Sequence, residues 1–112
     1  MAGTVDEAAA ADIVTVRVKM GGVLMATIVS PGTGVTAKGW HISGNATLRG
    51  VGGAAVMPWH IDMSVATNSS DAHGVGSVNT GIVQNVTVTV QWNNAKAGNI
   101  FTCDQGFMEY KH

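Results

Sequence analysis

Apolar side chains recur at every second position through most of this chain, which favours β-strands over helices. The clearest case is residues 82–92 (IVQNVTVTVQW), where valines and Trp92 alternate with threonines and a glutamine. Successive side chains on a strand point to opposite faces, so such a segment buries one face and exposes the other. Residues 13–20 (IVTVRVKM) repeat the pattern, and no segment of comparable length shows a helical period.

Further strands are expected between turn signals rich in glycine and proline. They are residues 23–29, 40–49, 54–65 and 100–111. The segment 23–29 (VLMATIV) is apolar on both faces and suits a strand covered on both sides. Gly21-Gly22 should close a tight hairpin before it. Seven or eight short strands predict an all-β sandwich or barrel, although the pattern does not give the strand order.

Two polar segments are expected to lie outside the strands. Residues 1–12 (MAGTVDEAAAAD) are rich in alanine and acidic, so they predict a short flexible N-terminal arm. Residues 66–81 (ATNSSDAHGVGSVNTG) are rich in turn formers and predict a long polar loop. Pairing of part of this loop as a short strand is the alternative. The length of 112 residues then leaves one domain, at 13–112.

Charged residues make up only 12% of the chain, against roughly 25% in a typical soluble domain. A small domain normally covers its large surface with such side chains, so this scarcity predicts that part of the surface is covered by other chains. The six basic residues are scattered, which argues against nucleic-acid binding: Arg17, Lys19, Lys38, Arg49, Lys96 and Lys111. No membrane span or secretory signal is evident, and synthesis in a cytoplasm is expected.

Few residues carry the spacing of a chemical site. His60, Asp62 and Ser64 share one face of a predicted strand, but neighbours two apart lie about 6.5–7 Å from each other, too far for a nucleophile and its base. Histidines at 41, 60, 73 and 112 lack metal-motif spacing, so no cofactor is expected. A metal held by three copies of one histidine on a symmetry axis remains an alternative. The chain is therefore not expected to be an enzyme.

The remaining distinctive side chains are best explained as core. Cys103 is the only cysteine, which excludes an intrachain disulfide and predicts a small buried side chain. Trp40, Trp59 and Trp92 all fall on the apolar phase of their strands and are expected inside. One exposed tryptophan stacking on a sugar ring is the alternative.

The order of these segments resembles a known family. The strand GWHISGNATLRG carries Trp40 and then Thr47-Leu48-Arg49 before a glycine turn, and AAVMPWHIDMSV follows. After the polar loop come VQNVTVTVQWNNAKAGN, with Val90-Gln91-Trp92 closing its strand, and a short acidic-aromatic end, FMEYK. Over residues 13–111 this is similar to the jelly-roll, tumour-necrosis-factor-like domain of bacteriophage structural proteins, which include head decoration (cement) proteins and fibre knobs.

The resemblance implies an antiparallel jelly-roll β-sandwich of about eight strands that forms a homotrimer. It further implies a virion protein that binds the major capsid protein on the outside of a phage head and stabilises it. The expected oligomer interface is the two-sided strand and the outward row of the penultimate strand: Val23, Met25, Thr27, Thr87, Thr89 and Gln91. The expected capsid contact is the arm, through Val5, Asp6 and Glu7. The alternative function is a receptor- or glycan-binding knob of a tail fibre or spike.

Overall fold

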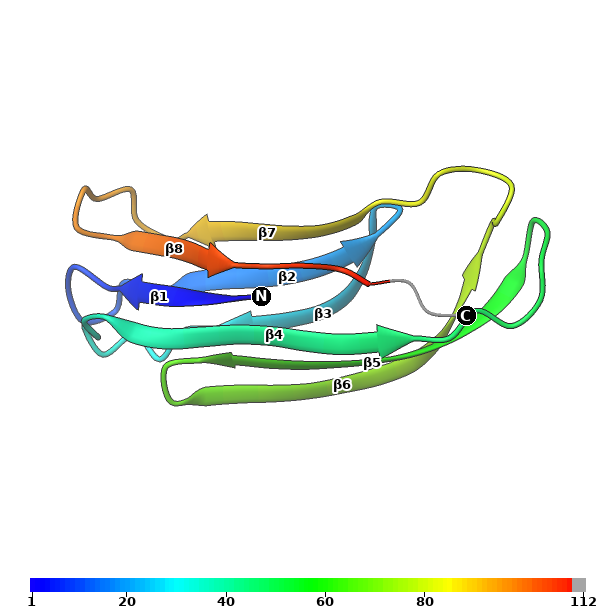
Figure 1. Cartoon of the computed structure of the whole chain (residues 1–112). Helices are drawn as coiled ribbons and strands as arrows, with labels where there is room; N and C mark the ends of the chain where they lie inside the picture. Colours follow the sequence, from blue (N-terminus) through cyan, green and yellow to red (C-terminus); the bar gives the residue numbers. More distant parts are fainter. Residues whose placement is uncertain (110–112) are drawn as a thin grey trace.

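A computed structural model describes residues 1–109, and these form eight β-strands and no helix (Figure 1). The strands are β1 (Ala2–Asp6), β2 (Val14–Met20), β3 (Val23–Val29), β4 (Lys38–Ala46), β5 (Ala55–Val65), β6 (Asn68–Val78), β7 (Val86–Trp92) and β8 (Ile100–Gln105). All ladders are antiparallel, in a five-stranded sheet of order β6-β5-β4-β1-β8 and a three-stranded sheet of order β3-β2-β7. The predicted all-β, two-sheet class is therefore confirmed.

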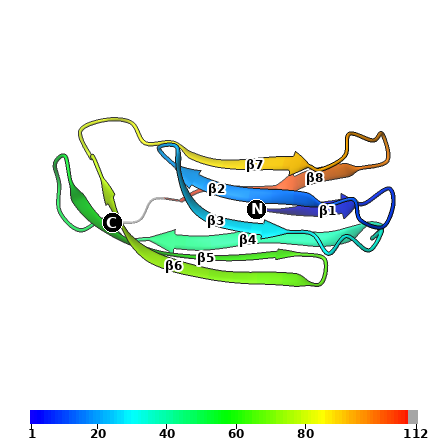
Figure 2. The same ribbon diagram turned by 180° about the vertical axis from the view of Figure 1, so that it is seen from behind.

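The two sheets face each other in an elongated sandwich measuring 48 × 22 × 20 Å. At one long edge β3 packs against β5 and β6. At the other edge β7 and β8 are the outermost strands of their two sheets, and they form the upper border of the sandwich in Figures 1 and 2. The first strand pairs with the last, and the second pairs with the seventh. These two long-range pairings are nested in sequence, and the β4-β5-β6 meander lies between their members along the chain.

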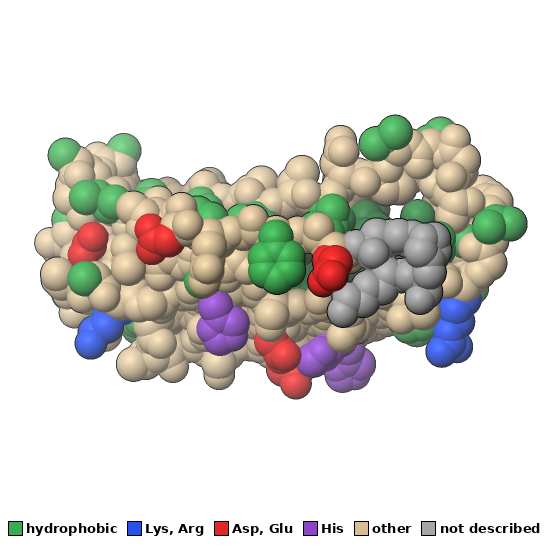
Figure 3. Space-filling view, in the orientation of Figure 1, with side chains coloured by type: hydrophobic (Ala, Val, Ile, Leu, Met, Phe, Trp, Pro, Cys, Tyr) green, Lys and Arg blue, Asp and Glu red, His purple; other side chains and the backbone are tan. Residues whose placement is uncertain are grey.

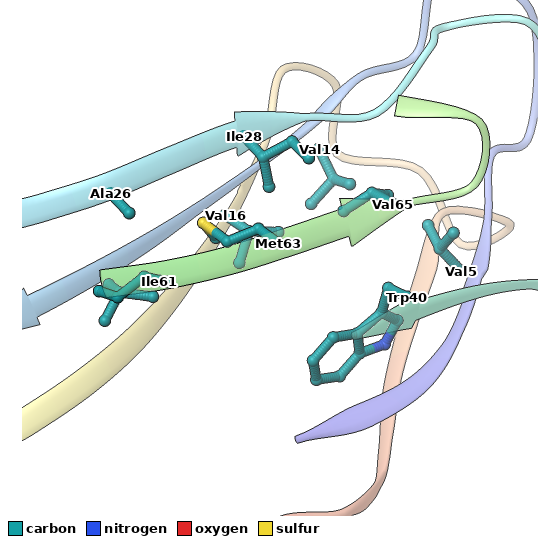
Figure 4. Close-up of a cluster of buried hydrophobic side chains, with 10 residues drawn as sticks. Val5, Val14, Val16, Ala26, Ile28, Trp40, Ile61, Met63 and Val65 are labelled. Carbon is teal, nitrogen blue, oxygen red and sulfur yellow. The ribbon is translucent and has the colours of Figure 1, made fainter. Parts of the chain in front are cut away.

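The core forms where the apolar phases of the two sheets meet (Figure 4). On β2, Val14, Val16 and Val18 are buried while the residues between them are half-exposed, as the alternation predicts. Met63 and Val65 of β5 cover them from the opposite sheet and are each 1% exposed. These side chains join the sheets by removing apolar surface from water, at about 25 cal/mol per Å².

The N-terminal segment is not a flexible arm, and that expectation is wrong. Residues 2–6 form β1, which lies inside the larger sheet between β4 and β8. Gly3 makes this possible, because a Cβ there would stand 1.8 Å from the carbonyl oxygen of Thr102 and 2.8 Å from Nε1 of Trp40. The Trp40 indole passes over this bare position and donates its N–H to the Thr102 oxygen at 2.7 Å. A strand of the sheet thus depends on a residue without a side chain.

Glu7, just after β1, is buried and fastens the loop that follows β3. Its side chain accepts hydrogen bonds from the Ser30 hydroxyl and from the backbone N–H groups of residues 32–35, with the distances between 2.5 and 3.1 Å. Burial acts to raise the pKa of Glu7, but the bond from Ser30 and those from the backbone outweigh it, and the pKa is lowered. The carboxylate is therefore ionised inside the protein and acts as a structural clasp.

Asp12 forms a second clasp, on the loop between β7 and β8. Asn94 Nδ2 donates to it at 2.7 Å, and Lys96 Nζ lies 3.0 Å from both carboxylate oxygens. These donors hold the pKa of Asp12 below its usual value. Asn93 and Asn99 add bonds to the backbone of residues 8, 11 and 13. The N-terminal segment, which was expected to be flexible, is thus bound both to the loop after β3 and to the loop between β7 and β8.

Residues 66–81 are mostly strand rather than loop, so the expected long loop is wrong apart from its ends. Eleven of these residues form β6, which pairs along its whole length with β5. The inward positions are small, including Ala72, Gly74 and Gly76, and Trp59 of β5 fills the space above Gly74. Since small residues carry little hydrophobic signal, the alternation was hidden in the sequence.

Candidate functional site

The expected oligomer interface divides between two surfaces. On β7, Thr87, Thr89 and Gln91 are exposed on the outer face of the smaller sheet, as predicted from the alternation. Gln91 there accepts a hydrogen bond from Arg17 Nη1 at 3.0 Å. Thr89 and Thr87 pair with Arg17 and Lys19 of β2, so this face also carries two cations.

On β3 the expected row Val23, Met25 and Thr27 does not share one face. A register shift places Thr27 opposite Arg17 but Val23 opposite Met20, and these partners are three residues apart on β2. Met25 packs against the core, while Val23 is 68% exposed. The prediction that this strand is covered on both sides is wrong, because a β-bulge inverts the alternation and β3 is covered on one side only.

The inward phase of β7 reveals an incompletely closed core. Val86 and Val90 pair with Met20 and Val16 and therefore point toward the opposite sheet. Each is nevertheless 41% exposed, whereas Val16 on the neighbouring strand is fully buried. Ile100 at the start of β8 is 46% exposed, but it pairs with Asp6 and lies on the outer face of the larger sheet, whereas its neighbour Phe101 pairs with the buried Val5. The edge formed by β7 and β8, which we call the open edge, thus leaves core-facing valines in contact with water.

A second apolar surface lies at the end of the molecule where the loops after β4 and β6 meet. Val51, Ile82 and Val83 are between 62% and 89% exposed there. Nearby, a cavity of about 300 Å³ opens between the β2–β3 hairpin and the ends of β5 and β6. Its lining includes Trp59, Gln84 and apolar residues of β3. Here the half-buried Trp59 adjoins the polar side chains of Gln84 and Ser77.

The expected capsid contact through Val5, Asp6 and Glu7 is not available as an exposed arm. Val5 is fully buried and Glu7 is 4% exposed, because both belong to the packed region around β1. Asp6 is half-buried and accepts a hydrogen bond from the backbone N–H of Ala37 at 2.6 Å. Direct contact through Val5 and Glu7 would require part of the sheet to unfold, so this expectation is corrected.

The outer face of β4, β5 and β6 is a polar lattice. Residues aligned across the three strands form rows, among them His41–Ser64–Ser69 and Ser43–Asp62–Asp71. The third row is Asn45, His60 and His73. Figure 3 shows histidine and acidic side chains adjoining along the lower border of the molecule, while lysine and arginine lie toward its two ends. His60, Asp62 and Ser64 thus belong to a polar outer face of the larger sheet.

Within this lattice His60 and Ser64, which share one face of β5, contact different side chains. His60 Nε2 lies 2.6 Å from Asp71 Oδ1 and 3.5 Å from Asp62 Oδ1. Ser64 Oγ instead bonds to His41 Nδ1 at 2.6 Å. The separation of His60 from Ser64 follows from their positions on an extended strand. Within residues 1–109, no carboxylate forms a hydrogen bond with the other ring nitrogen of His41, so a third group that would orient the imidazole as a base is missing from this part of the chain.

Two further expectations met different outcomes. Cys103 is exposed and unpaired, so its expected burial is wrong; it sits on β8 at the open edge. Trp40 is 3% exposed and stacks on Phe101 with ring centroids 4.6 Å apart, which confirms it as core. Trp59 and Trp92 are half-buried and pack against the core cluster. His112 lies outside the described residues.

Comparison with protein-family models, with curated proteins and with solved structures gave no match. Among residues 1–109 there is also no helix of a length and apolarity that would cross a membrane.

Proposed function

We propose that this chain is a structural protein of a bacteriophage virion, a homotrimeric decoration protein that binds the outside of the head. The observation that carries the proposal is the open edge, where core-facing Val86 and Val90 remain 41% exposed. Exposed apolar surface of this kind marks a site of association, because covering it removes the cost of hydrating it. The low charge content supports the same conclusion.

The trimer interface is proposed to centre on β7. As an edge strand, β7 offers its inner valines at the open edge and its outer row of Thr87, Thr89 and Gln91 to neighbouring copies. A rigid trimer that binds several capsid subunits gains avidity, and it stabilises the shell because it binds only the assembled form. The nested pairing of first with last and second with seventh strand supports the jelly-roll assignment behind this function.

The capsid contact is proposed to lie away from β7, at the apolar end with Val51, Ile82 and Val83. These side chains are the most exposed apolar group outside the open edge and the chain end, and they occupy loops, which adapt to a partner more readily than strands. The protein would accordingly be synthesised in the host cytoplasm and reside on the capsid exterior. No catalytic turnover, nucleic-acid binding or membrane binding is part of this proposal.

Light scattering after size exclusion tests the trimer directly at micromolar concentration. The chain should elute with three times its 11.5 kDa mass. Val90→Asp should yield monomers, since a charge cannot be buried unpaired in an apolar interface. Ser69→Lys, an exposed change on the opposite sheet, is the matched control and should leave the trimer intact. A monomeric unmodified protein would overturn the trimer.

Sedimentation with purified phage heads tests the decoration role. The protein should pellet with expanded heads and stay soluble with unassembled coat protein, and Val83→Asp should weaken pelleting without altering the trimer. If the protein binds neither the expanded heads nor the unassembled coat protein of a phage whose genome encodes it, the decoration role is rejected.

A glycan-binding knob is the second candidate, favoured by the cavity beside Trp59. A half-buried indole next to Gln84 and Ser77 offers the stacking surface and hydrogen-bonding groups that sugars use. Binding on a glycan array that is lost in Trp59→Leu would support the knob over the decoration protein. An array without a signal would remove this alternative.

A further inference from the structure

The polar lattice brings four groups able to bind metal onto adjacent positions of one hairpin. Asp62 of β5 is directly opposite Asp71 of β6, and His60 is directly opposite His73. Members of each strand are two residues apart and so project from the same face. Two carboxylates directly opposed on a sheet repel each other, and a cation between them would remove that cost.

The distances fit a small cation for three of these groups. Ligand atoms of His60, Asp62 and Asp71 all lie within 4.8 Å of one another. Zinc binds imidazole nitrogen and carboxylate oxygen at about 2.0–2.2 Å, so ligand atoms at a tetrahedral centre stand about 3.4 Å apart. His60 Nε2 and Asp62 Oδ1 are already 3.5 Å apart.

Asp71 needs only a small adjustment. It lies 2.6 Å from His60 Nε2, as expected for a hydrogen bond, and must retreat by about 0.8 Å to reach the spacing of metal ligands. Its side chain is 69% exposed, so rotation meets little resistance. A cation would thus replace the proton that now joins His60 to Asp71.

We propose that His60, Asp62 and Asp71 bind one Zn²⁺ or a chemically similar divalent transition ion per chain, leaving the other positions to water or to His73. The imidazole selects this class of ion over Ca²⁺ and Mg²⁺, which prefer oxygen ligands in greater number. Two carboxylates also neutralise the charge of the ion. The site lies on the larger sheet, away from β7, so it is independent of the proposed trimer interface.

Titration calorimetry of metal-free protein with zinc chloride tests this assignment. One zinc ion per chain should bind at micromolar or lower concentration, and calcium or magnesium chloride should give no comparable heat. Asp71→Asn should weaken zinc binding about tenfold or more, and His60→Gln should abolish it, because each removes a ligand. Since the substituted side chains are partly exposed, the variants should fold, which circular dichroism checks.

His41→Gln provides the matched control, because His41 lies on the same face but bonds to Ser64 rather than to the cluster. It should leave zinc binding unchanged. In NMR spectra, zinc should shift the imidazole resonances of His60 and leave those of His41 in place. Absence of zinc binding, or binding that survives in the double variant His60→Gln/Asp71→Asn, would overturn the site.

Discussion

Replacing Glu7 with glutamine tests whether a buried carboxylate holds this end of the fold together. Oε1 accepts the backbone N–H groups of Thr33, Gly34 and Val35, while Oε2 accepts that of Gly32 and the hydroxyl of Ser30. Glutamine is nearly the same size but offers only one acceptor oxygen. Its NH₂ group would face donors, so the change removes charge and acceptors without creating a cavity.

The expected loss follows from these bonds. One backbone N–H left without an acceptor costs about 1–3 kcal/mol, and three bonds that change from charged to neutral lose about 1 kcal/mol each. The uncharged glutamine avoids the cost of burying a carboxylate, which offsets about 2 kcal/mol of this loss. The free energy of unfolding should therefore fall by about 3 kcal/mol. For a domain of this size that lowers the melting temperature by about 12 °C.

Urea unfolding followed by tryptophan fluorescence, at fixed chain concentration, measures the effect. Because the pKa of Glu7 is lowered in the folded protein, its contribution is fully present above the unfolded value of 4.5 and is lost as pH falls through the folded pKa. The difference between Glu7→Gln and the unmodified protein should therefore be constant near neutrality and shrink in acid. Asp104→Asn, at an exposed carboxylate, is the control. A Glu7→Gln loss no larger than that of the control, or one independent of pH, would refute the reasoning.

Two further substitutions address the backbone. Gly3→Ala should destabilise the protein by more than about 3 kcal/mol in the same assay, since the new methyl group overlaps the Thr102 carbonyl and the Trp40 indole. A loss below 1 kcal/mol would mean that β1 is held less tightly than described. Ala66→Gly should instead stabilise by about 1 kcal/mol and raise the melting temperature, because Ala66 has a φ of 54° in the tight turn between β5 and β6, a left-handed conformation that costs non-glycine residues energy. No increase in thermal melting would contradict that explanation.

The strands were predictable wherever large apolar residues alternate with polar ones. The segments 14–20 and 86–92 are strands in the structure, and the Gly21-Gly22 turn has both φ angles positive, at 56° and 82°. This succeeded because period-two burial is a local property of the sequence. The number of strands predicted a sandwich or a barrel, but the division into two sheets and the strand order required coordinates.

What could not be predicted depends on contacts distant in sequence. β1 has a single large apolar residue, Val5, and its place in the sheet is set by Gly3 lying beneath Trp40 and beside β8. The bulge at Met25, which splits the expected interface, leaves no mark in a segment that is apolar on both faces. For the candidate metal cluster, the i and i+2 spacing of His60 and Asp62 was visible, but Asp71 joins them only through the register of β5 and β6.

The pairing of β1 with β8 limits the order in which the strands can pair during synthesis. During synthesis β1 emerges long before β8, its neighbour in the sheet, whereas β4, β5 and β6 can pair as soon as they appear. Contacts between residues almost a hundred positions apart form slowly, because the entropy of closing the long loop is lost before the contacts stabilise the fold. The nascent chain therefore passes through a stage in which β1 lacks one of its two neighbours in the sheet and presents an unpaired strand edge.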